Sequence, residues 1–173
     1  QAIKYYSNAL LSKGDTIKAI PYMEKSLSLG VSDFNYIVGD YYFKQKEFSK
    51  AKKYFETSIN DSRSLTNLGT MYFSDSLGVA HDFEKAINFY KIAADSGNSV
   101  AMYALGMIYL NGYNVIEKNL TLAQKWFNSV IIKNDNNEAQ LKIAELYRDG
   151  NSNGIQINYE KHAEIIKKLS QKN

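Results

Sequence analysis

A two-part motif recurs along the 173 residues of this chain and constrains its fold more than any other feature. The first part is a small residue that follows an apolar residue and precedes a tyrosine by three positions. Its four copies place the small residue at Gly39, Gly69, Gly106 and Ala144. From Gly69 to Gly106 the period is 37 residues. Periods of this size are typical of stacked helical repeats, in which a unit buries its apolar face only against its neighbours.

The second part is a residue, usually alanine, that is followed three and four positions later by bulky side chains. Its five copies centre on Ala19, Ala51, Ala86, Ala123 and His162. Both parts space apolar residues three and four apart, which predicts helices. The chain has only 1 proline, so few breaks are forced. We therefore expect about ten helices, paired antiparallel, and essentially no β-strand.

The ends and the packing of these helices are also predicted. Four polar residues lie seven positions before the small residue of their unit and are expected to be N-caps: Ser32, Ser62, Ser99 and Asn137. A glycine inside a helix costs about 1 kcal/mol relative to alanine, so its recurrence needs a structural reason. We expect each small residue to face the small residue of the second helix, as Gly106 would face Ala123.

The motif resembles the tetratricopeptide repeat, which has Leu-Gly-x-x-Tyr in its first helix and Ala before an aromatic residue in its second. The later units are more similar to Sel1-like repeats. This similarity is carried by two segments, Ala101-x-x-x-Leu105-Gly106-x-x-Tyr109-x-x-Gly112 and Gly78-Val79-x-x-Asp82-x-x-Lys85-Ala86-x-x-Phe89-Tyr90-x-x-Ala93-Ala94-x-x-Gly97. The first two units are shorter between their helices and look like ordinary tetratricopeptide repeats.

The resemblance implies an all-α fold, namely a right-handed α/α superhelical solenoid of about five antiparallel helix-pair repeats. The single array would comprise tetratricopeptide-like units at 1–31 and 32–61 and Sel1-like units at 62–98, 99–136 and 137–173. We expect the last unit to be a C-terminal cap, because four charged residues give its second helix a polar outer face: Lys161, Glu164, Lys167 and Lys168. The array is expected to end near Asn173, whereas repeats can continue before Gln1.

The resemblance also implies a function. It points to a scaffold or adaptor that binds a protein or peptide partner, and we expect the chain itself to be a monomer. Two alternatives stay open. One is an immunity or inhibitor protein that neutralises a secreted bacterial toxin, and the other is a structural repeat that self-assembles. A bacterial source is expected in either case.

Composition excludes other classes of function. The 21 Lys and Arg are mostly interleaved with the 18 Asp and Glu, and a net charge of +3 predicts no nucleic-acid partner. The absence of cysteine excludes disulfides and thiolate metal sites. No apolar run reaches membrane-spanning length, so we expect a soluble protein without membrane insertion. No signal peptide is seen, but the sequence starts at Gln1 and not at a methionine, so this absence has little weight. Bacterial cytoplasm and periplasm are therefore not distinguished.

No motif in the sequence predicts catalysis or a cofactor, and we expect neither. His81 and His162 each lack a second ligand three or four positions away, which argues against zinc. One segment has the spacing of a calcium loop, with candidate ligands at Asp149, Asn151, Asn153 and Glu160. Only two of these ligands are charged, so a polar turn rich in Asn and Gly is the preferred interpretation.

The candidate site is a second stripe of side chains on the first helices, which lies three before, one after and four after each small residue. This spacing places these side chains on a different face of each helix from the apolar residues that are expected to pack in the core. Its candidate partner-binding residues are Tyr36, Asp40, Phe43, Thr66, Thr70, Phe73, Tyr103, Met107 and Leu110, with the neighbouring Asn111; the last unit has Leu141, Glu145 and Arg148 instead. By resemblance, first helices line the concave groove, where apolar anchors would meet a partner. Alternatively, Phe43, Phe73 and Leu110 pack against the next repeat.

Overall fold

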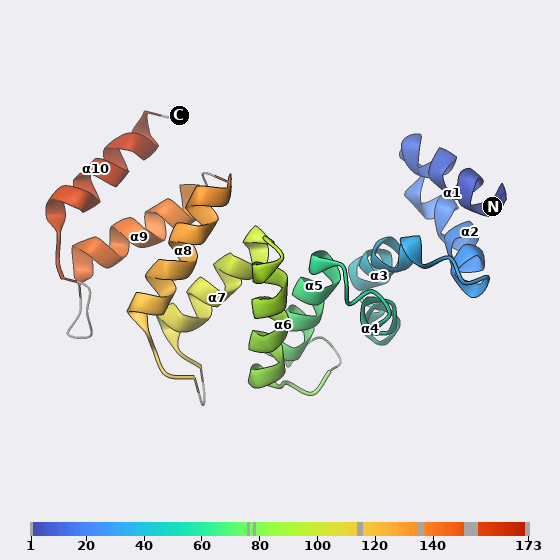
Figure 1. Ribbon diagram of the computed structural model, residues 1–173, viewed down its shortest axis with the longest axis horizontal. Helices are drawn as coiled ribbons and strands as arrows, with labels where there is room; N and C mark the ends of the chain where they lie inside the picture. Colours follow the sequence, from blue (N-terminus) through green and yellow to red (C-terminus); the bar gives the residue numbers. More distant parts are fainter. Residues whose placement is uncertain are drawn as a thin grey trace. The chain divides into compact units, whose positions relative to one another are not determined.

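The computed structural model describes residues 2–75, 77, 79–113, 116–134, 137–150 and 156–171, and of residues 133 and 134 only the backbone. The described residues form ten α-helices and one 3-10 helix, and none of them lies in a β-strand (Figure 1). The all-α prediction is therefore confirmed. The first elements are α1 (Ala2–Ser12), α2 (Thr16–Ser28), η1 (Ser32–Phe34), α3 (Asn35–Lys44), α4 (Phe48–Glu56) and α5 (Ser62–Phe73). They are followed by α6 (Phe83–Asp95), α7 (Ser99–Asn111), α8 (Leu120–Asn134), α9 (Asn137–Asp149) and α10 (Tyr159–Ser170).

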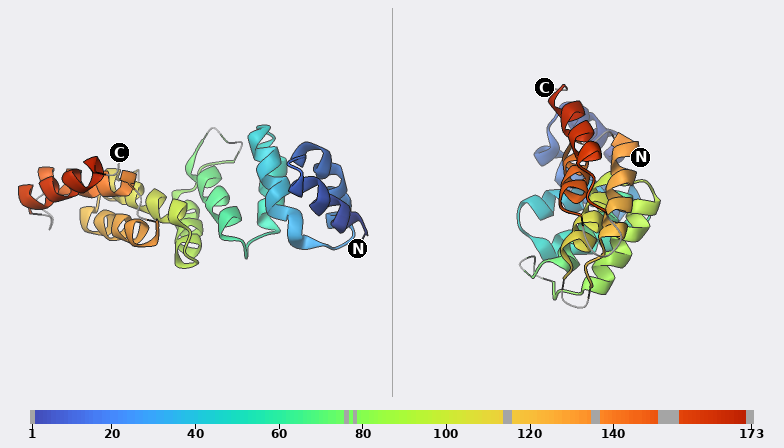
Figure 2. Two further views of the ribbon diagram at one scale, coloured as in Figure 1. Left: turned by 90° about the horizontal axis from the view of Figure 1, so that it is seen from above. Right: turned by 90° about the vertical axis from the view of Figure 1, so that its left-hand side faces the viewer.

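The chain divides into two compact units, residues 1–86 and 87–173, and the division falls inside α6. In unit 1, α1 packs on α2 and α3 packs on α4, whereas in unit 2, α7 packs on α8 and α9 packs on α10 (Figure 2). Only residues 13–15 separate α1 from α2, and only residues 45–47 separate α3 from α4. Helices that touch across such short connections run antiparallel.

Successive pairs stack by one rule in both units, with the second helix of a pair packed on the first helix of the next. This rule holds for α2 on α3 and α4 on α5 in unit 1, and for α8 on α9 in unit 2. The buried cluster of unit 1 comprises Ala19, Ile20, Met23, Phe34 and Val38. The buried cluster of unit 2 comprises Leu120, Ala123, Phe127, Val130, Ala139, Ile143 and Leu146. The core therefore lies both inside the helix pairs and in the interfaces between successive pairs, as a stacked array requires.

Two of the helical glycines, Gly39 and Gly106, face phenylalanine rings, which corrects the expected contact with alanine. A Cβ atom on Gly106 would lie 2.5 Å from Cε1 of Phe127, and one on Gly39 would lie 2.7 Å from Cε1 of Phe55. Phe127 and Phe55 each lie four positions after the alanine, Ala123 or Ala51, that was expected to make the contact. Side chains lean toward the N-terminus of their helix, so the Phe127 ring lies over the turn that holds Ala123. Alanine leaves room for the ring, and glycine accepts it.

Two of the four predicted helix caps lie one residue earlier than predicted. The predicted cap Asn137 is the first residue of α9, and the residue before it lies outside the described part of the chain. Asn98 caps α7, because its side-chain oxygen accepts hydrogen bonds from the backbone N–H of Val100 (3.0 Å) and Ala101 (3.1 Å). Asp61 likewise caps α5 instead of Ser62. Ser32 opens the 3-10 turn η1 and accepts a bond on its carbonyl oxygen from Asn35. The aspartate and asparagine precede serine in the sequence, and either type is a good N-cap.

A polar brace ties the first helix pair to the second. The Glu24 carboxylate on α2 accepts hydrogen bonds from the hydroxyls of Tyr42 (2.7 Å) and Tyr54 (2.9 Å). The two tyrosine rings are stacked, with their centroids 5.7 Å apart. Burial, followed by the bond to Glu24, raises the pKa of Tyr54 to about 12, and the bond to Glu24 is the main reason that the pKa of Tyr42 is also raised.

Candidate partner-binding surface

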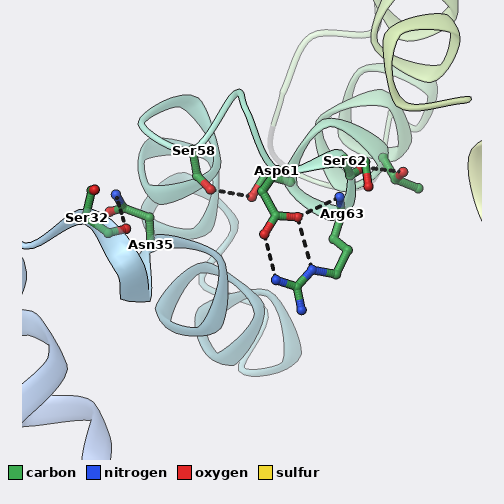
Figure 3. A network of polar contacts seen from close by, with 8 residues as sticks. Ser32, Asn35, Ser58, Asp61, Ser62 and Arg63 are labelled. Carbon is green, nitrogen blue, oxygen red and sulfur yellow. Dashed lines mark hydrogen bonds and ion pairs between the residues drawn. The ribbon is translucent and has the colours of Figure 1, made fainter. Parts of the chain in front are cut away.

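On α3 the stripe starts at Tyr36, whose ring is covered by a cation. The guanidinium carbon of Arg63, from the start of α5, lies 3.9 Å from the ring centroid. Arg63 is itself held by the Asp61 carboxylate, with its Nε at 3.0 Å and its Nη2 at 2.6 Å (Figure 3). These bonds hold the pKa of Asp61 below its usual value, and burial raises the pKa of Tyr36. One face of the Tyr36 ring is thus covered by the guanidinium group.

The other stripe residues of unit 1 differ in exposure. Asp40 is half-buried and paired with Lys44 at 2.7 Å. Phe43 is half-buried and meets Phe48 edge-on, at a centroid distance of 5.4 Å. Both phenylalanines of that contact belong to one helix pair, and Phe73 similarly meets the first residue of α6, Phe83, at 5.3 Å. Phe43 therefore makes its ring contacts within its own helix pair.

The two stripe threonines bond to their own helix. Thr66 is buried, and its hydroxyl donates to the carbonyl oxygen of Ser62 at 2.7 Å. The Thr70 hydroxyl is half-buried and donates to the carbonyl oxygen of Thr66 at 3.1 Å. Bonds of this kind to the preceding turn engage the hydroxyl proton. Both threonines could meet a partner only as acceptors, and Thr66 has little exposed surface.

In unit 2 the stripe lies on α7. The Tyr103 ring rests against the buried Phe127, with centroids 5.5 Å apart, and its hydroxyl donates to the Glu138 carboxylate at 2.8 Å. Burial and this bond raise the pKa of Tyr103 to about 12. Met107 and Leu110 are half-buried and pack against the cluster between α8 and α9. Asn111 is exposed, and its amide donates to the Tyr113 hydroxyl at 3.2 Å.

A repeated contact joins successive first helices along the stripe. In each case the residue three before one small residue meets the residue six before the next. Tyr36 meets Arg63 and Tyr103 meets Glu138. The same register gives the ion pair between Lys4 and Asp33, if Ser7 is the small residue of α1. Ser7 is buried and lies twelve residues before Ala19, as Gly39 lies twelve residues before Ala51. We call these three contacts the rungs.

Sequence reasoning missed Arg63 and Glu138, although a signal for both was present. Arg63 lies three residues before Thr66 and Glu138 lies three residues before Leu141, so each extends the stripe by one turn. In the last unit, Leu141 is exposed on the surface.

Two grooves lie away from the stripe, and neither was predicted. The groove of unit 2, of about 640 Å³, is lined by Asn128, Ile131, Gln140, Ile143, Tyr147, Lys161, Glu164, Ile165, Lys168 and Gln171. The groove of unit 1, of about 580 Å³, is lined by Ser49, Lys52, Lys53, Glu56, Tyr72, Val79, Ala80, His81, Asp82 and Lys85. In the latter, the ammonium groups of Lys52 and Lys85 lie 5.4 Å and 5.6 Å from the centroid of the Tyr72 ring. In both grooves most of the charged groups already have partners within the chain.

The candidate metal ligands are only partly described. Among the residues that the structure covers, no three His, Cys, Asp or Glu side chains gather as a metal site would require. The Asp149 carboxylate accepts bonds of 2.7 Å and 3.0 Å from Arg148, which lower its pKa. Asn151 and Asn153 lie outside the described residues, so the preference for a polar turn over a calcium loop remains a prediction. In the described ranges, no helix has both the length and the apolar composition needed to cross a bilayer.

Two family models match segments of the chain. The Sel1 repeat matches residues 62–98, 99–129 and 137–163, and the tetratricopeptide repeat matches residues 32–60. Repeats of these two kinds are generally protein-interaction scaffolds and are typically non-enzymatic.

Similar proteins come from a virus, yeasts and bacteria. A sel1-like repeat-containing protein of Acanthamoeba polyphaga mimivirus is 33% identical over 55% of this chain and 18% of its own length. Chitin synthase regulatory factor 3 of Schizosaccharomyces pombe is 23% identical over 71% of this chain and 14% of its own. The chain thus spans less than a fifth of these curated relatives, and its bacterial source remains an expectation.

Solved structures share the fold. A protective antigen of uropathogenic Escherichia coli with an SLR fold has a TM-score of 0.79 and 18% identity, over 91% of this chain and 34% of the antigen. A Sel1 repeat protein from Oxalobacter formigenes has a TM-score of 0.77 and 21% identity, over 99% of this chain and 72% of that protein. With Sel1 models matched over more than half of its residues, the chain belongs to the Sel1-repeat family.

Proposed function

We propose that this chain is an adaptor that binds a protein or peptide partner through the stripe. The stripe has one part in each unit, on α3 and α5 in unit 1 and on α7 in unit 2. Each part is a binding surface in its own right. The general role of Sel1 and tetratricopeptide repeats as interaction scaffolds supports this proposal.

The observation that carries the proposal is that large stripe side chains are supported on one side and reach water on the other. Phe43, Phe73 and Tyr103 are each half-buried against an aromatic ring of another helix. A side chain held in this way loses little conformational entropy when a partner covers it. Rigid aromatic anchors of this kind typically dominate the energy of an interface.

The rungs add charge beside these anchors. Arg63 borders the ring of Tyr36, and Glu138 holds the hydroxyl of Tyr103. Arg63 is itself paired with the Asp61 carboxylate, so unit 1 offers a paired charge, whereas unit 2 offers the Glu138 carboxylate. These groups favour a partner with matching charges, which affects specificity and association rate more than affinity. The names of two relatives, Activator of C kinase protein 1 of Saccharomyces cerevisiae and Chitin synthase regulatory factor 3, support an enzyme as the partner.

A photo-crosslinking experiment identifies the partner and the face together. A photoreactive amino acid placed at Phe73 or at Tyr103 should capture the partner, whereas the same group at the exposed Lys53 should not. The captured protein is identified by mass spectrometry and then purified for affinity measurements.

With that partner, we predict that Phe73→Ala combined with Tyr103→Ala weakens binding by roughly tenfold or more, because two anchors are removed. Circular dichroism should show unchanged helix content. Tyr103→Phe is the matched control: it keeps the ring, loses the bond to Glu138 and should bind more tightly than Tyr103→Ala. If the double variant binds normally and Lys53→Glu abolishes binding, the stripe is the wrong face.

A further inference from the structure

A lysine of the second helix lies over a tyrosine ring of the first helix in three of the helix pairs. The lysine is one residue before the centre of the second-helix motif, and the tyrosine is three residues after the small residue of the first helix. The ammonium nitrogens lie 4.8 Å, 5.6 Å and 5.1 Å from the ring centroids, in the pairs Lys50 and Tyr42, Lys85 and Tyr72, and Lys161 and Tyr147. The first two contacts belong to unit 1 and the third to unit 2. This cation–π contact is thus a regular part of the repeat.

In unit 1 each of these lysines pairs with a carboxylate three residues before it. Lys50 lies 2.5 Å from the Glu47 carboxylate, and Lys85 lies 2.9 Å from the Asp82 carboxylate. Both acidic residues directly precede or open the second helix of their pair. The positive charge over the tyrosine ring is therefore balanced locally in both repeats.

A second carboxylate in unit 1 comes from the second helix of the preceding pair. It lies five residues after the alanine of that helix, at Glu24 on α2 and at Glu56 on α4. Glu24 accepts a hydrogen bond from the Tyr42 hydroxyl at 2.7 Å, and Glu56 pairs with Lys52 at 3.2 Å. Lys52 in turn lies 5.4 Å from the centroid of the Tyr72 ring. In unit 1 the lysine and the tyrosine therefore have acidic residues at two positions of the repeat.

In unit 2 both of these acidic positions hold an asparagine. The residue three before Lys161 is Asn158, whose side-chain oxygen accepts the backbone N–H of Lys161 at 2.9 Å. The residue five after Ala123 on α8 is Asn128. Within the ranges that the structure describes, the Lys161 ammonium has no ion pair and the Tyr147 hydroxyl has no hydrogen bond. The contact on α10 thus keeps its cation and its hydroxyl but lacks the acidic group that both meet in unit 1.

This lysine and this tyrosine line the groove of unit 2, of about 640 Å³. The groove lies between two successive second helices, α8 and α10, over the first helix α9. The groove of unit 1 has the same construction, between α4 and the start of α6 and over α5, in the middle of the sequence. A groove at this place is therefore a property of the repeat and not of an end of the chain.

The groove of unit 2 combines an apolar surface with an excess of positive charge. Its aliphatic side chains come one from each helix, as Ile131, Ile143 and Ile165. Its charged lining residues are two lysines and one glutamate, which gives a net charge of +1. The glutamate, Glu164, already accepts from Lys168 at 2.7 Å. The groove is therefore complementary to an apolar ligand with a negative charge.

We propose that the groove of unit 2 binds an acidic, apolar peptide segment of a partner protein. A glutamate or aspartate side chain of the segment takes the place that Glu24 has in unit 1. Its carboxylate accepts a hydrogen bond from the Tyr147 hydroxyl and pairs with the Lys161 ammonium. This inference does not depend on the proposed function, because no residue of the stripe lines the groove.

The length of the groove suits a short extended peptide. Its lining residues on α10 run from Lys161 to Gln171, which is about 15 Å at the rise of an α-helix. An extended chain covers this length with about five residues. Because alternate side chains of an extended chain point to one side, apolar residues two before and two after the acidic residue would cover the three isoleucines together with it.

The experiment titrates the isotope-labelled chain with the end-blocked peptide Leu-Ser-Glu-Ser-Leu and follows its backbone amides by NMR. Signals of Ile143, Tyr147 and Ile165 should shift, whereas those of the stripe should not. The peptide Leu-Ser-Gln-Ser-Leu keeps the shape and loses the charge. It should bind roughly fivefold more weakly, which is the upper range for an exposed ion pair.

Two variants of the chain test the cation and the acidic position. Lys161→Gln should weaken binding of the glutamate peptide roughly fivefold and leave the glutamine peptide unaffected, because the two changes remove the same ion pair. Asn128→Glu supplies the carboxylate that Glu24 supplies in unit 1, so it should block the glutamate peptide. Lys167→Gln is the matched control: it removes the same charge from α10 outside the groove and should bind like the natural chain. Circular dichroism checks that each variant folds.

Four results would overturn the inference. The first is a titration without shifts in the groove up to millimolar peptide, and the second is equal binding of the two peptides. The third is an Asn128→Glu variant that binds the glutamate peptide like the natural chain. The fourth is octanoate binding as tightly as the peptide, as expected for a site that takes small apolar acids. Failure of the stripe to bind its partner would change none of these measurements, so the two proposals fail separately.

Discussion

The Phe127 ring determines how closely α7 and α8 approach each other. It is fully buried, it lies over Gly106, and it also supports Tyr103 of the stripe. One side chain therefore links the packing of the pair to the position of a candidate anchor. Phe55 has the same relation to Gly39 in unit 1, where it also contacts Tyr36 and Phe43 of the stripe.

We predict that Gly106→Ala destabilises unit 2. Alanine gains about 1 kcal/mol of helix propensity, but its Cβ would lie 2.5 Å from a buried ring. Overpacking of this kind costs about 1–3 kcal/mol. Urea unfolding should give a lower free energy of unfolding than for the natural chain. Gly106→Ala combined with Phe127→Leu should lose less stability than the sum of the losses in the two single variants, because the smaller side chain leaves room for the new Cβ. If the two losses add in full, the two residues are not in contact.

A second prediction concerns Glu24 and alkaline pH. The folded chain raises the pKa of Tyr54 to about 12, above the value of 10.0 for a free tyrosine. Below pH 10 both states keep the proton, so the stabilisation is complete. As pH rises from 10 to about 12, the unfolded state releases its proton first and stability falls. Glu24→Gln should lower stability at pH 8, by about 1–3 kcal/mol for a lost charged hydrogen-bond partner.

The alkaline loss should also be smaller in Glu24→Gln, because one cause of the raised tyrosine pKa is removed. Burial of Tyr54 is the larger cause and persists, so part of the loss should remain. Melting temperatures measured at pH 8 and pH 11 test both statements. An equal alkaline loss in the variant and in the natural chain would contradict the role given to the carboxylate.

The residues of the repeat were predictable from the sequence, whereas their contacts were only partly so. Gly106 and Ala123 stood out because a costly glycine recurs in register. The position of the Phe127 ring between these two residues was not predictable, because the direction in which a side chain leans is a property of the folded helix. Arg63 and Glu138 belong to repeats other than those of the tyrosines they contact, so their roles depend on how neighbouring repeats are offset.

At the scale of the element, three of the helices start at a residue whose side chain caps them. Asp61, Asn98 and Asn158 all accept backbone N–H groups of the helix that follows. The predicted caps, Ser62 and Ser99, are the first helical residues instead. Seven-residue spacing identified the right turn of each helix but not the residue, because Asp-Ser and Asn-Ser offer two adjacent side chains of the capping type.

We predict that Asn98→Ala lowers the stability of unit 2 by about 1 kcal/mol, the usual cost of losing an N-cap. Asn98→Asp is the control, since it keeps the accepting oxygen and adds a negative charge where the helix dipole favours one. Thermal unfolding should rank Asn98→Asp close to the natural chain and Asn98→Ala below it. The reverse order would mean that the cap contributes nothing.

At the scale of the whole molecule, the fold is a series of helix pairs, each packed within itself and against the next pair of its unit. Ala139 and Ile143 of α9 are buried in the cluster that α9 shares with α8, whereas Tyr6 of α1 and Tyr159 of α10 are exposed. The family and the fold followed from the sequence, because the repeat motif states them directly. The partner did not, since the stripe residues that would bind it also pack within their own pairs.

This arrangement predicts a gradient of protection within each unit. Backbone amides of α1 should exchange with solvent faster than those of α3 in unit 1, and those of α10 faster than those of α8 in unit 2. The reason is that a helix with one uncovered face opens at a lower free energy. Hydrogen–deuterium exchange with mass spectrometry measures this in dilute solution, and equal rates for α1 and α3 would contradict it.

The use of the same interface positions in every repeat also bears on how such a chain can change in length. A duplication or loss of one whole helix pair, such as the 37 residues between Gly69 and Gly106, brings two faces of the standard kind together. A deletion of one or two residues inside a helix would instead turn every later side chain by about 100° per residue away from its neighbour. Gene changes in units of the repeat should therefore be tolerated, and the number of pairs can vary while each interface keeps its chemistry.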